Sequence, residues 1–120
     1  MPFCFIPGES QRLSASLPAW VKTTEWLLAN AKNGVSGVLT AAVPYLQLAT
    51  GVCGGWLMGK AALAAAAYLD KGDGDERIYR NKIATARFYA DQILPQVDAW
   101  AATAMAGDAA IQGFGTELFD

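Results

Sequence analysis

Hydrophobic positions along the chain repeat at helical intervals, and the regular alternation of β-branched residues that is typical of strands is missing. The first apolar stripe follows i, i+3, i+4, i+7 spacing and consists of Leu17, Trp20, Val21, Thr24, Leu27, Leu28 and Ala31. Ser16 is a suitable N-cap for this stripe, and Asn33-Gly34 is a suitable C-terminal stop. The pattern predicts a helix over residues 16–32, preceded by an irregular tail over residues 1–14.

The second predicted helix, over residues 36–70, is apolar on all sides. No charged residue lies between Lys32 and Lys60, and Gly72 is a suitable stop. Pro44 falls early in the segment, so it either bends the helix or marks its true first turn. Since both neighbouring helices have one apolar face, we expect this helix to be the buried centre of a helical bundle.

Apolar positions in the third segment recur in alternating steps of four and three residues, which is the spacing of a heptad seam. They are Tyr79, Ile83, Ala86, Ala90, Ile93, Val97, Trp100 and Ala104. Asp73 and Glu76 have the spacing of a capping box, and Pro95 predicts a kink within the helix. We therefore predict a third helix over residues 74–106 and a short C-terminal tail over residues 108–120.

Together, these segments predict an all-α fold. It is an antiparallel helical bundle of one short helix plus a long helical hairpin, with residues 15–107 as its domain. At a rise of 1.5 Å per residue, the first helix would be about 25 Å long and each arm of the hairpin about 45–50 Å. A short helix cannot cover both arms, so we expect an exposed apolar patch and a homodimer. The interface candidates are Trp26, Trp56 and Phe88, because aromatic side chains dominate interface energetics.

Glycine recurs once per helical turn in the second helix, at Gly51, Gly55 and Gly59. Each glycine inside a helix costs about 0.5–1 kcal/mol relative to alanine, so we predict that these are helix-packing residues which let another surface come close. Glycines with this spacing, in a long uncharged segment, are also typical of a transmembrane helix pair. The polar residues of the segment, and its alanine and glycine content, favour instead a core helix in a soluble bundle, with no membrane partner.

Composition argues against chemistry within this chain. It has no histidine, which removes the usual general base and the commonest metal ligand. Its net charge of −2 favours no nucleic-acid partner. Cys4 and Cys53 fit no metal-binding or redox spacing, which is typical of free thiols in a reducing compartment, so we expect a cytoplasmic protein. We predict no catalytic, cofactor-binding or metal-binding residue.

Two stretches of the predicted hairpin resemble a known family. They are VPYLQLATGVCGGWLMGKAALAA at residues 43–65 and KIATARFYADQILPQVDAW at residues 82–100. Both are similar to the C-terminal helical extension of a subgroup of acyl-CoA dehydrogenases, the acetyl-CoA dehydrogenase C-terminal-like domain. The residues that carry the resemblance are Tyr45, Gly51, Gly54, Gly55, Trp56, Ala86, Arg87, Phe88, Tyr89 and Pro95.

The resemblance implies an accessory domain with a structural or assembly role. In that family the extension follows a flavoprotein body that binds FAD and the acyl-CoA, and the whole enzyme is an oxidoreductase of fatty acid metabolism. None of that body lies in these 120 residues, so no catalytic or FAD-binding residue of the family is carried over. The resemblance leaves two partners open, a second copy of the chain or the acyl-CoA dehydrogenase body. The alternative function is a stand-alone helical dimerisation or protein-interaction module.

Overall fold

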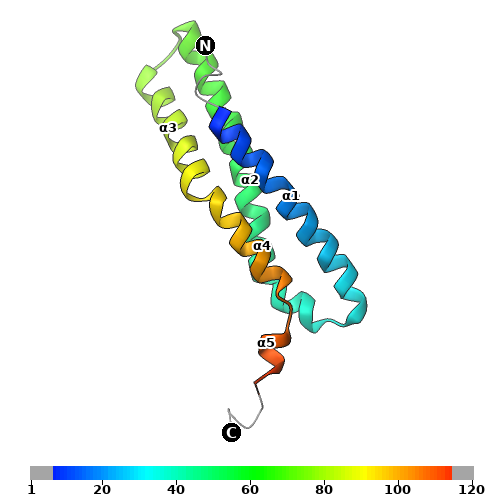
Figure 1. Ribbon diagram of the computed structural model, residues 1–120. Coiled ribbons are helices and arrows are strands. Elements are labelled where there is room, and N and C mark those ends of the chain that lie inside the picture. The colour runs from blue at the N-terminus through cyan, green and yellow to red at the C-terminus, as the bar shows by residue number, and fades with distance from the viewer. Residues whose placement is uncertain (1–6, 115–120) are drawn as a thin grey trace.

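In the computed structural model, which describes residues 7–114, the chain is an all-α bundle of antiparallel helices (Figure 1). The elements are α1 (Pro7–Asn30), η2 (Ala31–Asn33), α2 (Ser36–Lys71), α3 (Glu76–Gln92), η3 (Leu94–Gln96), α4 (Val97–Met105) and α5 (Ala109–Gln112). Helix α2 runs the length of the molecule, and α1, α3 and α4 pack along it. The body measures 66 × 30 × 17 Å, so the bundle is long and thin. The predicted fold class is confirmed, including the long helical hairpin.

Helix α1 is longer than the sequence pattern predicted. It begins at Pro7 and has 24 residues, so the predicted start at residue 16 and the irregular tail over 7–14 are wrong. Proline is tolerated at the first position of a helix, where its missing N–H has no partner in any case. Pro18, in contrast, lies inside the helix without ending it. At about 36 Å, α1 covers more of the hairpin than expected. The remaining part of the predicted tail, residues 1–6, lies outside the described residues.

Helix α1 does not bury the face that its apolar stripe predicted. Three of its large apolar side chains are exposed, Leu17 at 45%, Val21 at 57% and Leu28 at 67%. Ser16 and Thr23 are buried instead, and each hydroxyl donates a 2.7 Å hydrogen bond to a carbonyl of its own helix. Because these small side chains are already hydrogen-bonded, they let α1 approach its neighbours closely without an unpaired polar group.

Helix α2 continues unbroken through Pro44, so this proline does not mark its first turn. Only one face of α2 is buried, which corrects the expectation of a fully buried central helix. The buried residues are Ala41, Pro44, Leu48, Gly51, Val52, Gly55, Ala62, Ala65 and Ala66. The other helices lie on that side, so among residues 7–114 nothing covers the opposite face. By length and composition α2 could cross a membrane, although 28% of its apolar window is buried against the rest of the bundle.

The third predicted helix is divided in two. Helix α3 ends at Gln92, a 3₁₀ turn contains Pro95, and α4 begins at Val97, because proline lacks the N–H that a continuous helix needs there. The start is also different from the prediction. Asp75, and not Asp73, caps α3, since its side chain accepts a 2.9 Å hydrogen bond from the Arg77 amide. Five residues of the predicted heptad seam are buried, namely Ile83, Ala86 and Ala90 in α3 and Val97 and Ala104 in α4. Trp100 of the seam is only half-buried, and Ala101, which the seam did not include, is buried beside it.

Candidate functional site

The best-defined local geometry is a close junction between α2, α3 and α4, at three glycines of α2. A Cβ atom on Gly51 would lie 2.8 Å from Trp100 Cζ3, and one on Gly55 would lie 2.9 Å from Leu94 Cδ2. A Cβ atom on Gly54 would lie 2.9 Å from Tyr89 Cζ and still closer to its hydroxyl. These glycines therefore give room to large side chains from the facing helices.

Gly59 does not belong to this junction. A Cβ atom there would have no heavy atom within 4 Å, so its prediction as a helix-packing residue is wrong. The space beside it is a small apolar cavity of about 170 Å³ between α1, α2 and α3, which Gly55 and Gly59 both line. An added Cβ atom would thus meet a facing side chain at Gly51 and Gly55, and also at Gly54, which the glycine spacing did not name as a packing position.

One hydrogen bond crosses the junction. The Tyr89 hydroxyl of α3 donates to the Gly51 carbonyl oxygen of α2 at 2.8 Å. Burial raises the pKa of the Tyr89 hydroxyl above its ordinary value of 10.0, and negative charge on Cys53 raises this pKa further. The tyrosine is therefore neutral at physiological pH and acts as a structural donor between the two helices.

Helix α1 is joined to α2 by a second polar contact. Trp20 Nε1 donates to the Tyr45 hydroxyl at 3.2 Å, and the same hydroxyl lies 2.9 Å from Thr24 Oγ1. Thr24 uses its own proton to bond the Trp20 carbonyl oxygen at 2.8 Å, so Tyr45 is the donor to Thr24. An Arg12–Asp91 ion pair at 3.1 Å joins α1 to α3 at the surface.

The three predicted interface aromatics do not share one surface. Trp26 is half-buried and lies 3.8 Å from the position of a Cβ atom on Gly107, so it packs against its own chain. Trp56 is 53% exposed, and the Lys60 ammonium lies 4.6 Å from its ring centroid. Phe88 is 63% exposed on the outer side of α3, about half a turn from the buried seam. A single contact patch cannot include all three.

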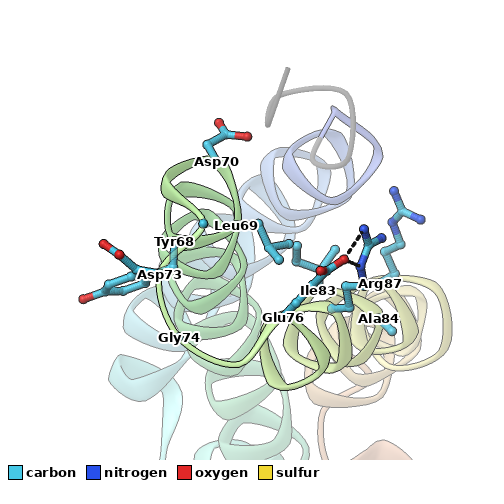
Figure 2. Close-up of a pocket in the computed structure, with 11 residues that line it drawn as sticks. Tyr68, Leu69, Asp70, Asp73, Gly74, Glu76, Ile83, Ala84 and Arg87 are labelled. Carbon is cyan, nitrogen blue, oxygen red and sulfur yellow. Dashed lines mark hydrogen bonds and ion pairs between the residues drawn. The ribbon is translucent and has the colours of Figure 1, made fainter.

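A cavity of about 640 Å³ opens at the turn between α2 and α3 (Figure 2). Its side chains include the ion pair of Glu76 with Arg80, whose Nη2 lies 2.6 Å from Glu76 Oε1. The carboxylates of Asp70 and Asp73 point away from the space between the helices. The carboxylate of Glu76 is thus ion-paired, and those of Asp70 and Asp73 are directed into solvent. Within residues 7–114, moreover, no group of three His, Cys, Asp or Glu residues could hold a metal ion.

An exposed apolar face lies across α1 and α2; the sequence pattern predicted such a patch, but not the residues that form it. It consists of Leu17, Val21, Leu28, Leu39, Val43, Leu46 and Leu57, each between 45% and 67% exposed. We call this set the α1–α2 apolar face. On α2, these leucines and valines follow alternating steps of four and three residues together with Thr50 and the exposed Cys53. That spacing was readable in the sequence, but a helix that is apolar all round does not reveal which side its own chain will cover.

The fold and the close junction together define a class of protein: an all-α helical domain in which the helices pack closely and one apolar face is exposed. The comparison with protein families then gives the family. The family model described as "Acetyl-CoA dehydrogenase C-terminal like" matches residues 7–114, so the chain belongs to that family. This confirms the resemblance of residues 43–65 and 82–100 and extends it over residues 7–114, which include part of the predicted N-terminal tail.

A curated relative supports the same assignment. The chain is similar to the 3-methylmercaptopropionyl-CoA dehydrogenase of Ruegeria pomeroyi, with 38% identity over 90 residues. The match covers 75% of this chain and 15% of that enzyme. No solved structure matches the chain significantly. The chain is therefore similar to a small part of a much longer dehydrogenase.

Proposed function

We propose that this chain is the accessory C-terminal domain of an acyl-CoA dehydrogenase-like flavoenzyme, with a structural or assembly role and no catalytic residue of its own. The observation that carries the proposal is the family match over 7–114 combined with the small share of the dehydrogenase that it represents. FAD belongs to the body of the parent enzyme in this proposal. The cytoplasm is the proposed location, in keeping with the exposed free thiol of Cys53.

The residues of the family signature support a structural role. Gly51, Gly54 and Gly55 give room to large facing side chains, and Tyr45 and Tyr89 form the hydrogen bonds that hold α1 and α3 against α2. Each of these residues fixes the relative position of two helices. A domain built this way presents its outer surfaces at fixed positions, which is what a partner subunit or an enzyme body requires.

A replacement experiment in the related dehydrogenase tests this function. In the Ruegeria pomeroyi enzyme, the segment that matches this chain would be exchanged for residues 7–114. We expect the hybrid to purify as one species that retains bound FAD and dehydrogenase activity within about tenfold of the parent. Deletion of the segment should instead give aggregated or flavin-depleted protein. The readouts are flavin absorbance per subunit, mass by light scattering, and turnover of the parent's substrate.

Two outcomes would contradict the proposal. A deletion variant that keeps its FAD, mass and activity would show that the domain has no structural role in such an enzyme. A 120-residue chain that purifies with about one equivalent of flavin, or oxidises an acyl-CoA alone, would show that it carries chemistry of its own. The alternative, a stand-alone helical interaction module, would be favoured by a well-folded chain whose replacement into the enzyme gives no functional hybrid.

A further inference from the structure

We infer that the α1–α2 apolar face binds a second copy of this chain, with the two α2 helices antiparallel across a twofold axis near residue 48. This inference deepens the proposed assembly role by naming the partner. It rests on three observations: the two helices turn their exposed apolar residues to the same side, the spacing on α2 is symmetric, and the exposed area fits a dimer.

Helices α1 and α2 both contribute to one continuous face. Trp20 of α1 and Tyr45 of α2 face each other through their hydrogen bond. At 100° per residue, the exposed residues of α1 lie about 60–100° around its axis from Trp20, and those of α2 about 80–160° from Tyr45, in the same sense. Because α1 and α2 are antiparallel, rotation in the same sense about each helix axis, starting from the contact between the two helices, leads to the same side of the pair. The buried Thr23 and Leu48 lie about 60° in the opposite sense, toward α3 and α4.

The register of the two helices makes this face contiguous. Tyr45 contacts residues one turn apart, Trp20 and Thr24, so the middle of α1 lies level with residue 45 of α2. With the same rise on both antiparallel helices, Leu28 lies level with Leu39, and Val21 with Leu46. The exposed side chains therefore form adjacent rows rather than scattered single residues.

The row of exposed residues on α2 has a symmetric spacing. Its members are Leu39, Val43, Leu46, Thr50, Cys53 and Leu57, separated by steps of four, three, four, three and four residues. This order reads the same in both directions about residue 48. In an antiparallel pair, Leu39 therefore meets Leu57 of the other copy, Val43 meets Cys53, and Leu46 meets Thr50. A surface that contacts itself across a twofold axis requires such self-complementarity.

The exposed area of the α1–α2 apolar face is also large enough for a dimer interface. A fully exposed valine or leucine has about 175–200 Å² of accessible surface, so the seven residues expose about 800 Å², close to the ~800 Å² per partner of a standard interface. This also exceeds the largest apolar patch of a typical monomer, which is about 300–600 Å².

The composition of the face favours protein over lipid. No charged residue lies on α2 between Lys32 and Lys60, and the chain has a net charge of −2. Helices that lie on anionic membranes have polar faces rich in lysine and arginine, which α2 lacks. One side of α2 is also covered by the rest of the bundle, which leaves a single stripe rather than a lipid-facing cylinder.

Mass measurement on the isolated 120-residue chain is the first test. We expect sedimentation equilibrium and light scattering to give twice the chain mass of 12.7 kDa at micromolar concentration. A single species of 12.7 kDa at high concentration would overturn the inference. This test needs no flavoprotein. A monomeric chain would therefore contradict the dimer without contradicting the proposed function, and a failed replacement experiment would contradict the proposed function without contradicting the dimer.

A matched pair of charge variants locates the interface. Leu46→Glu places two carboxylates near the twofold axis, so we expect the dissociation constant of the dimer to increase at least about 100-fold. Phe88→Glu makes the same kind of change at an equally exposed residue, 63% against 62%, on the far side of α3. The control should leave dimerisation unchanged. Circular dichroism must show both variants to be fully helical. Equal effects of the two variants, or an effect of Phe88→Glu alone, would overturn the inference.

Cross-linking tests the antiparallel register independently of folding stability. With Cys4→Ser as background, adding Val43→Cys places a thiol opposite Cys53 of the other copy, and mild oxidation should give a covalent dimer. The background variant alone should not cross-link, because its two Cys53 residues would lie about 15 Å apart along the helices. Cross-linking of the background variant, or none of the double variant, would overturn this register.

Vesicle flotation tests whether the α1–α2 apolar face binds lipid instead. The chain would be mixed with vesicles of phosphatidylcholine and phosphatidylglycerol at 3:1. We expect it to remain in solution as a dimer. Flotation of the wild-type chain with the vesicles, lost in Leu46→Glu but kept in Phe88→Glu, would assign the face to lipid and overturn the inference.

Discussion

The middle of helix α2 and its C-terminal part pack in different ways. Around residues 48–55, the buried face of α2 packs against α1, α3 and α4, and a cluster of large side chains and glycines includes Leu48, Leu94 and Trp100. Around residues 62–66, the core against α3 consists of alanines with Ile83 as its main large side chain. We call these the glycine junction and the alanine core. Both bring helices close together, but only the glycine junction has a hydrogen bond between helices among its described contacts.

The difference shows two solutions to the same problem. Glycine lets one helix receive a large side chain from its neighbour, which gives a specific fit and large buried area per residue. Alanine lets two helix backbones approach each other evenly, with little area buried and little register specificity. We therefore expect stability to be concentrated in the glycine junction, and the alanine core at the tip of the hairpin to open locally at lower cost.

Core truncation should give the largest difference between the two regions. Leu48→Ala removes a fully buried side chain, at 0% exposure, and we expect a loss of about 3–4 kcal/mol in the free energy of unfolding. Ile83→Ala, at 7% exposure between two helices, should cost about 2 kcal/mol, because the open site relaxes more easily. Urea denaturation at constant m-value measures both. A larger loss for Ile83→Ala would reverse the comparison.

Adding bulk at two glycines tests whether close approach is confined to the junction. Gly55→Leu introduces a side chain where a Cβ atom already lies 2.9 Å from Leu94, so overpacking should cost about 1–3 kcal/mol. Gly59→Leu meets open space and gains helix propensity, so it should stabilise the fold by about 0.5 kcal/mol. Thermal melts of the two variants provide the measurement. If both melt at the wild-type temperature, the junction is looser than described.

Removing single hydroxyls compares the polar contacts of the two regions. Tyr89→Phe deletes the hydrogen bond to the Gly51 carbonyl and should cost about 1 kcal/mol. Tyr79→Phe is the matched control beside the alanine core, where the ring stacks on Tyr68 at a centroid distance of 5.2 Å. Its effect should stay within about 0.5 kcal/mol. Chemical denaturation can resolve the two values, and equal losses would remove the polar distinction between the regions.

Alkaline pH should have the smallest effect, again confined to the junction. The pKa of Tyr89 is raised in the folded chain, so above pH 10 the unfolded chain releases this proton first. The stability contributed by Tyr89 is therefore complete below pH 10 and is lost as pH rises through the folded-state pKa. The loss between about pH 9 and pH 11 should be smaller in Tyr89→Phe than in wild type. An identical pH profile would show that burial of Tyr89 has no energetic consequence.

Local signals in the sequence predicted most helix ends. Gly72 ends α2 in a left-handed conformation at φ 70°, as its position suggested, and Pro95 interrupts the third helix. The predicted start of α1 was wrong because Ser16 is a suitable N-cap, whereas the helix begins at Pro7 and accommodates Pro18 inside. The N-cap at Asp75 was also missed, because Asp73 and Asp75 are both suitable capping residues and only the backbone path decides between them.

The sequence by itself determined the helical class, the hairpin and the family, because periodicity, glycine and proline act over a few residues and signature motifs are read directly. Only the tertiary structure decided which faces are covered. Gly55 packs closely while Gly59 lies open, and α1 buries Thr23 while exposing Val21. These outcomes depend on where neighbouring helices begin and end and on how closely they approach. A pattern of apolar residues indicates that a face favours burial, but it does not indicate which partner covers that face.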